Sequence, residues 1–391
     1  MNPIIRAPVL FDLGFRVFFL CAGIYSVISV SMWALIYIGR LNLPVTSITM
    51  FEWHAHEMIY GYTLAVVSGF LLTASATWTG LRTLHGWPLA GLTIPWLIAR
   101  VLFLSGHILY AGIFDFLFIG LLSIAVIIPI ARVRQHRQAG IIAKLVLFLP
   151  GVVIFGLGAA GILPYGTRLG VYGGLYLIIG LILMMGRRVL PMFIKSGVEE
   201  AVNPVNPRWL DIASLLLYLV FFIAVLIPAG AMIAAWSALL LFIINAWRLV
   251  CWHTSGIWRK PLVWVLYAGF WFITLGFLLF FLAHHGYVPI FNAVHAFAYG
   301  GIGLMTLGMM ARVSLGHTGR SIHAPPVAIQ IAFGVLLLGA VVRVFIPLLV
   351  PVVEYKWWIG LSQAMWIIAF VLFIAVYTPM LVHARVDGRT I

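Results

Sequence analysis

Long apolar runs, separated by short polar segments, repeat along the whole chain. Most runs have about the twenty residues that an α-helix needs to cross the hydrocarbon core of a bilayer. They lack the short alternating pattern of membrane β-strands. Cutting the chain at Pro, Gly and charged clusters gives twelve such runs, near residues 15–38, 53–77, 87–106, 108–131, 141–162, 169–190, 209–228, 229–250, 262–284, 289–315, 328–348 and 357–382. The pattern predicts an all-α integral membrane protein with about twelve transmembrane helices.

Composition points to the same class of protein. Of the 391 residues, 64% are hydrophobic and 8% are charged, against about 45–50% and 25% in an average soluble domain. The formal net charge of +14 does not indicate nucleic-acid binding, because the basic residues lie between the apolar runs. Two cysteines, Cys21 and Cys251, cannot make a disulfide framework. The first apolar stretch is interpreted as a span rather than a cleaved signal, because many similar stretches follow it.

The distribution of basic residues predicts the orientation. Eighteen of the 23 Lys and Arg residues fall in connections on one side, three on the other, and two, Arg100 and Arg343, inside predicted spans. Cytoplasmic loops carry the excess of Lys and Arg, so both termini are expected to be cytoplasmic. Residues 1–391 are expected to form a single polytopic domain, and a Pro- and Asn-rich stretch near residues 191–208 could divide six helices from six.

Ionisable residues at membrane depth are the informative ones, because each is costly there unless it is paired or functional. Helix two begins with His54 and His56 next to two glutamates. Arg100 is expected about 20 Å and Arg343 about 24 Å from the inner ends of their helices. His295 lies near the outer end of helix ten. These residues are expected to converge in the outer half of the bilayer.

An ungapped alignment of residues 51–80 with 290–319 places His56 and His295 at equal depth on two helices that run in the same direction. The seven identical pairs are His56/His295, Tyr60/Tyr299, Gly61/Gly300, Gly69/Gly308, Ser75/Ser314, Thr79/Thr318 and Gly80/Gly319. Two histidines at matching depth could hold a haem between them, with the paired glycines allowing close approach of the macrocycle. Arg100 and Arg343 could clamp haem propionates or snorkel to the lipid headgroups.

A second group of polar residues is expected at the inner face. His317 is predicted there, together with Arg187, Arg188, His253, Arg312 and His323. Along an unbroken helix His317 would lie about 33 Å from His295, so the two cannot share one metal. The candidate metal ligands are therefore His54, His56, His295 and His317, each weighed against an interfacial or structural role. The Met-Met pairs at 184–185 and 309–310 suit copper(I) but also fill cores.

Several motifs together resemble the NnrS family. They are Trp53–Tyr62 (WHAHEMIYGY), Gly186–Phe193 (GRRVLPMF), and Asn292–Ala296 followed by Met309–Arg320 (MMARVSLGHTGR). The similarity extends over essentially the whole chain and implies a bacterial inner-membrane protein that contains haem and copper and is associated with denitrification and nitric oxide tolerance. The motif positions that it carries over, without assigning a ligand to a metal, are His54, His56, Glu57, Arg187, Arg188, His295, Arg312 and His317.

The leading functional expectation is a protein that binds haem b, and also copper, and handles nitric oxide or metal-nitrosyl species under nitrosative stress. A haem oxidoreductase supplied by an electron donor is one form of it, since a five-coordinate iron permits chemistry whereas a bis-histidine haem favours electron transfer. The alternatives are a twelve-helix secondary transporter of a small anion or metal, with Arg100 and Arg343 as anchors, and a copper carrier.

Overall fold

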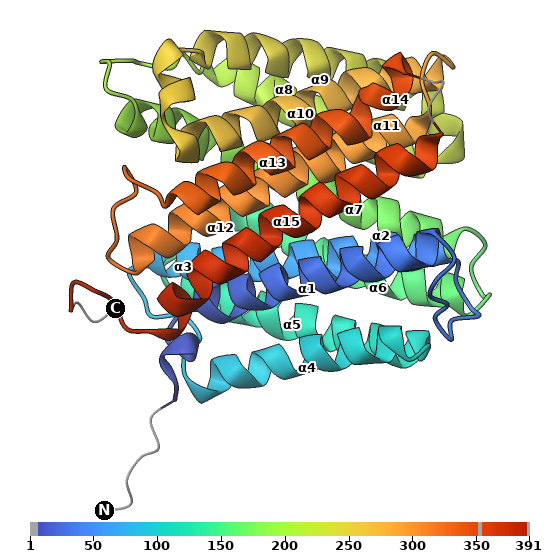
Figure 1. Ribbon diagram of the computed structural model, residues 1–391, viewed down its shortest axis with the longest axis horizontal. Helices are drawn as coiled ribbons and strands as arrows, with labels where there is room; N and C mark the ends of the chain where they lie inside the picture. Colours follow the sequence, from blue (N-terminus) through green and yellow to red (C-terminus); the bar gives the residue numbers. More distant parts are fainter. Residues whose placement is uncertain (1–6, 351–353, 389–391) are drawn as a thin grey trace, which may run out of the picture. The chain divides into compact units, whose positions relative to one another are not determined.

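The computed structural model describes residues 7–350 and 354–388 (Figure 1). Within these ranges the chain is helical and has no strand, and twelve helices are long and apolar enough to cross a membrane. The predicted fold class and number of spans are confirmed. The orientation of the termini stays a prediction.

The element bounds follow the predicted spans closely. The α-helices are α1 (Gly14–Tyr37), α2 (Met50–His56), α3 (Leu64–Thr79), α4 (Trp87–Leu104), α5 (Ile108–Arg132), α6 (Ala139–Ala159), α7 (Gly166–Gly197), α8 (Arg208–Leu226), α9 (Ala231–Trp252), α10 (Pro261–His284), α11 (Ile290–His295), α12 (Leu304–His317), α13 (Val327–Val344), α14 (Ile346–Leu349) and α15 (Tyr355–Val382). Two π-helical segments, η2 (Glu57–Thr63) and η6 (Ala296–Gly303), join α2 to α3 and α11 to α12. Short 3-10 turns lie at η1 (Val9–Phe11), η3 (His136–Gln138), η4 (Pro228–Gly230) and η5 (Ser255–Arg259).

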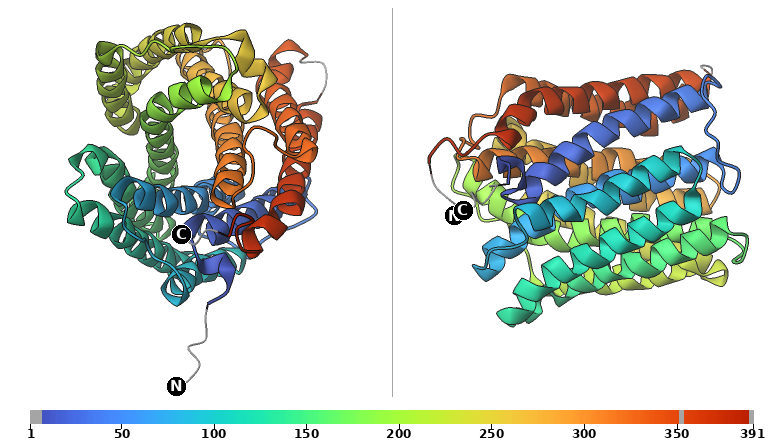
Figure 2. Two further views of the ribbon diagram at one scale, coloured as in Figure 1. Left: turned by 90° about the vertical axis from the view of Figure 1, so that its left-hand side faces the viewer. Right: turned by 90° about the horizontal axis from the view of Figure 1, so that it is seen from below.

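The chain divides into two compact units. Unit 1 comprises residues 1–177, 313–320 and 373–391, and unit 2 comprises residues 178–312 and 321–372. Inside each unit the helices run along one another, with connecting loops at their ends (Figure 2). The six-plus-six division near residues 191–208 stays a prediction from loop composition.

In unit 1 the start of the first span is tied to the end of the last. Arg16, at the start of α1, is 1% exposed. Its Nη1 donates to the carbonyls of Leu381 and His383, at 2.8 Å each. The last carbonyls of a helix have no partner within that helix, so this guanidinium caps α15. The contact places both ends on one side of unit 1, as an even number of spans requires.

In unit 2 the central element is α10, which packs against α9, α11, η6 and α13. Close contact between α10 and η6 depends on Gly300. A Cβ atom there would lie 2.2 Å from the ring of Phe272. Packing of this kind, a small residue opposite a large one, is how membrane helices approach closely without a hydrophobic driving force.

The two segments aligned in the sequence share their local structure as well. The π-helices η2 and η6 begin at aligned positions, one residue after His56 and His295. Thr79 and Thr318 each donate to the carbonyl four residues earlier at 2.7 Å. The following Gly80 and Gly319 have φ angles of 67° and 79°, the left-handed conformation that ends helices. Features this specific, at matching positions, indicate an internal repeat.

Candidate functional site

Five polar side chains meet in the interior of unit 1. His56 ends α2, Glu57 begins η2, Arg100 comes from α4, Asp115 from α5 and Tyr25 from α1. His56, Glu57 and Asp115 are 0% exposed, Arg100 3% and Tyr25 5%. Such groups are costly at membrane depth and mark functional sites by default. We call these five residues the buried cluster.

Arg100 holds two carboxylates at once. Its Nη1 pairs with Glu57 Oε1 and its Nη2 with Asp115 Oδ1, and Tyr25 donates its hydroxyl to Glu57 Oε2. With both carboxylates ionised, one guanidinium neutralises only one of them. With a neutral His56 the buried cluster therefore carries one net negative charge, which one further cation or proton would balance.

His56 is held at one ring nitrogen and left open at the other. Its Nδ1 lies 3.0 Å from Glu57 Oε1. Its Nε2 has no hydrogen-bond partner, although the atom is buried, and neither has Asp115 Oδ2. These two atoms lie 3.8 Å apart. Buried polar atoms without partners are rare and require an explanation, and here two of them face each other.

Aromatic rings enclose the imidazole of His56. The ring centroids of Phe103, Phe155 and Tyr60 lie 4.2, 4.4 and 4.7 Å from that of His56. These rings keep water from the imidazole and lower the local dielectric, which strengthens every electrostatic interaction in the buried cluster.

Gly61, in the π-helical segment η2, leaves space for side chains of the buried cluster. A Cβ on Gly61 would lie 2.7 Å from Tyr25 Cε1 and 2.8 Å from Arg100 Nη1. Gly61 therefore leaves space for the side chains of Tyr25 and Arg100, whereas the sequence suggested that it leaves space for a haem macrocycle. A π-helix disturbs the regular carbonyl pairing and is frequent at functional sites; the carbonyl of Gly61 is satisfied by Trp96 Nε1 at 3.0 Å.

A smaller polar group in unit 2 stands at the corresponding place of the repeat. His295 precedes η6; its Nδ1 lies 2.8 Å from the carbonyl of Phe291 and its Nε2 lies 3.1 Å from Arg343 Nη2. Arg343 also donates to the hydroxyl of Tyr355. The backbone carbonyl accepts the proton of Nδ1, so Nε2 presents its lone pair to the guanidinium. In both repeats, an arginine near the end of the following helix reaches the polar group beside the π-helix.

The remaining predicted residues are not gathered into one site. His54 stacks on Trp33, with ring centroids 4.6 Å apart, and is not part of the buried cluster. In unit 2, Arg187 pairs with Asp211 at 2.7 Å, Arg188 is exposed, and Arg312 lies over the ring of Phe193. His317 belongs to unit 1; its carbonyl accepts from Arg385 at 3.0 Å.

His56 belongs to unit 1 and His295 to unit 2, and a haem shared between them stays a prediction. In the described part of the chain, no three His, Cys, Asp or Glu side chains are grouped to hold a metal ion. Sequence reasoning missed Asp115 and Tyr25. Asp115 could have been found by the argument that singled out Arg100, since it is an acidic residue inside a predicted span; Tyr25 carried no such signal.

Helices of this length and composition, with an ionic cluster buried among them, define a multi-pass α-helical membrane protein with a polar interior site. The family model described as NnrS protein matches residues 9–385. The chain therefore belongs to the NnrS family, which confirms the resemblance seen in the motifs. No curated protein matches the chain significantly.

Proposed function

We propose that this protein binds copper and haem in the bacterial inner membrane and uses them to handle nitric oxide or metal-nitrosyl species during denitrification and nitrosative stress. Membership of the NnrS family supports the cofactors and the physiological setting, as the resemblance implies. The observation that carries the proposal is the buried Nε2 of His56, which has no hydrogen-bond partner while Nδ1 is held by Glu57.

This arrangement is the one that a metal-binding imidazole requires. Metal-ligating histidines usually give their other ring nitrogen to a carboxylate or carbonyl, which fixes the tautomer and raises the basicity of the ligating nitrogen. Glu57 stands in that position for His56, and Arg100 and Tyr25 hold Glu57 in turn. The imidazole is thus oriented before any ligand arrives.

The donor atoms fit a single metal ion. Metal bonds to histidine nitrogen and carboxylate oxygen are about 2 Å long, so His56 Nε2 and Asp115 Oδ2, 3.8 Å apart, can both reach one ion between them. A monovalent ion such as copper(I) also balances the net charge of the buried cluster. Since the protein supplies two donors, a position is left for a diatomic ligand.

We place copper rather than haem at His56, because the rings of Phe103, Phe155 and Tyr60 pack around the imidazole. His295 is the better candidate haem ligand. It is only partly buried, its Nδ1 is fixed by a carbonyl, and Arg343 beside it could pair with a propionate. A metal at either site would supply an atom that binds nitric oxide and exchanges electrons with an external donor.

The arrangement of the protein in the bilayer would let nitric oxide reach the metal and keep water away from it. Nitric oxide is neutral and apolar, so it enters through the bilayer and needs no polar channel. The aromatic enclosure of His56 keeps water away, and Arg100 pairs with both carboxylates. Asp115 and His56 then present an anionic and a neutral donor to the same point.

Separate variants test the two assignments. In the purified full-length protein, His56→Ala is expected to lose copper and keep haem, and His295→Ala to lose the haem Soret band and keep copper. The exposed His107→Ala is the matched control and should keep both. Metal analysis and visible spectra with and without nitric oxide give the readout. Loss of haem in both variants would favour the shared haem; full metal content in both would refute the proposal.

A secondary transporter is the second candidate, and one observation favours it. The interruptions η2 and η6 lie at matching positions of an internal repeat, as interrupted helices do around transporter substrate sites. In proteoliposomes, uptake of nitrite or copper by a preparation free of haem would favour transport. Nitric oxide binding without uptake would favour the metal protein.

A further inference from the structure

One buried arginine in unit 2 differs from the others. Among the described arginines, four are buried: Arg16, Arg100, Arg248 and Arg312. Arg16 caps the carbonyls of α15, Arg100 pairs with two carboxylates, and Arg248 pairs with Asp211 at 3.0 Å. Buried charges are almost always paired in this way, and Arg312 is the exception.

Arg312 is 8% exposed, and in the described part of the chain no carboxylate oxygen lies within 4.0 Å of its guanidinium. Its contact is with the ring of Phe193, whose centroid lies 3.7 Å from Arg312 Cζ. A ring face supports the cation but leaves its N–H groups without acceptors.

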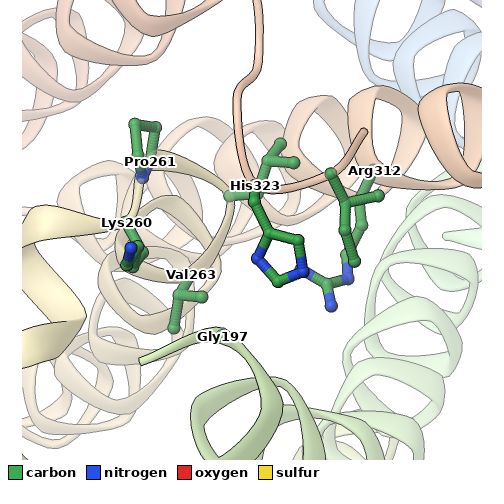
Figure 3. Close-up of a pocket in the computed structure, with 8 residues that line it drawn as sticks. Gly197, Lys260, Pro261, Val263, Arg312 and His323 are labelled. Carbon is green, nitrogen blue, oxygen red and sulfur yellow. The ribbon is translucent and has the colours of Figure 1, made fainter. Parts of the chain in front are cut away.

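These N–H groups face a pocket. It is lined by Gly197 at the end of α7, Lys260 and Val263 at the start of α10, Arg312 in α12 and His323 in the following loop. Figure 3 shows the Arg312 guanidinium and the His323 ring directed to the same part of the pocket. Lys260 is already paired with the exposed Glu199 at 2.6 Å, so the uncompensated charge belongs to Arg312.

We infer that this pocket binds a single oxyanion, a phosphate group or an anion of similar charge and shape. The Arg312 guanidinium would donate to two of its oxygens, the geometry in which arginine recognises phosphate. His323 and Lys260 add a donor each at the rim. This site does not depend on the metal chemistry proposed above, since neither His56 nor His295 lines the pocket.

The phosphate group could belong to a soluble anion or to a lipid headgroup. Two probes on the purified full-length protein in neutral detergent distinguish these sources: inorganic phosphate, followed by thermal unfolding against chloride at equal ionic strength, and phosphatidylglycerol, followed by native mass spectrometry. We expect Arg312→Gln to weaken binding of the effective probe about 10- to 100-fold, the value of a lost hydrogen bond to a charged group.

Arg312→Gln should also unfold at a higher temperature than the parent when no anion is present, because an uncompensated buried charge has been removed. Arg312→Lys should keep part of the affinity. His323→Ala, at an exposed position, should weaken binding several-fold and tests the site if Arg312→Gln does not fold.

Arg259→Gln, which removes an exposed charge outside the pocket, is the matched control and should leave binding unchanged. A response to inorganic phosphate assigns the soluble source, and a response to phosphatidylglycerol alone assigns the headgroup. If neither probe responds to Arg312→Gln, or if Arg259→Gln weakens binding equally, the inference is overturned.

Discussion

Replacing Arg100 by methionine tests the electrostatics of the buried cluster. The change removes the guanidinium that pairs with both Glu57 and Asp115, which are each 0% exposed, and leaves two carboxylates buried together without that cation. Breaking a buried ion pair by removing one partner costs about 3–5 kcal/mol. We expect Arg100→Met to lower the free energy of unfolding by that amount.

Asp115→Asn is expected to cost much less, because Arg100 keeps Glu57 as a partner and the buried cluster loses its excess negative charge. The double variant Arg100→Met/Asp115→Asn should recover part of the loss, since it leaves one uncompensated carboxylate where Arg100→Met leaves two. A coupling energy of about 0.5–3 kcal/mol is typical of residues in direct contact.

Unfolding by sodium dodecyl sulfate in mixed micelles, followed by circular dichroism, measures these free energies. Arg343→Met is the matched control, because Arg343 is only partly buried and contacts His295 and Tyr355 rather than a carboxylate; its cost is expected to be about 1 kcal/mol. If Arg100→Met costs no more than Arg343→Met, the buried cluster is not an ionic network and the charge balance argued for His56 fails.

Three further outcomes follow from particular contacts. Gly61→Ala should destabilise the protein by about 1–3 kcal/mol, because its Cβ would overlap neighbouring side chains; Gly91→Ala, which meets nothing within 4 Å, should be neutral in the same unfolding assay. Arg16→Gln should expose the C-terminal end of α15 to limited proteolysis, and unchanged cleavage would refute its capping role. The hydrogen bond and charge of Lys260 lower the pKa of Glu199. This ion pair therefore stabilises the folded protein at pH values above the pKa that Glu199 has in the unfolded chain. The stabilisation is lost as the pH falls through the lower pKa that Glu199 has in the folded protein. Glu199→Gln should therefore be less stable to unfolding than the parent at neutral pH and equally stable in acid. An equal difference in stability at both pH values would contradict this.

Replacing Glu57 by glutamine tests whether its carboxylate orients His56 as a metal ligand. Glu57→Gln keeps the side-chain volume but removes the carboxylate that faces His56 Nδ1. Loss of such a partner typically lowers metal affinity about 10- to 100-fold. Copper titration of the purified variant measures the change, and an affinity equal to that of the parent would show that Glu57 does not orient a metal ligand.

Much of the architecture followed from the sequence. The number of spans was predictable because a bilayer imposes one length on every helix that crosses it. His56, Arg100, His295 and Arg343 stood out because polar groups are rare inside such spans. The alignment of residues 51–80 with 290–319 matched the two segments in which the structure has π-helices, but it did not predict a π-helix in either.

What the tertiary structure decided is which of these residues meet. Helical periodicity fixes the position of a side chain on its own helix but not the neighbour it faces. Asp115 and Tyr25 belong to the buried cluster only because α5 packs against α4 and α1 packs against η2. His54, two residues from His56, stacks on Trp33 instead. Arg16, which lies at the start of the first predicted span, caps a helix that ends more than 360 residues further along the chain. Contacts between residues so distant in sequence depend on the packing of whole helices, and local sequence does not encode that packing.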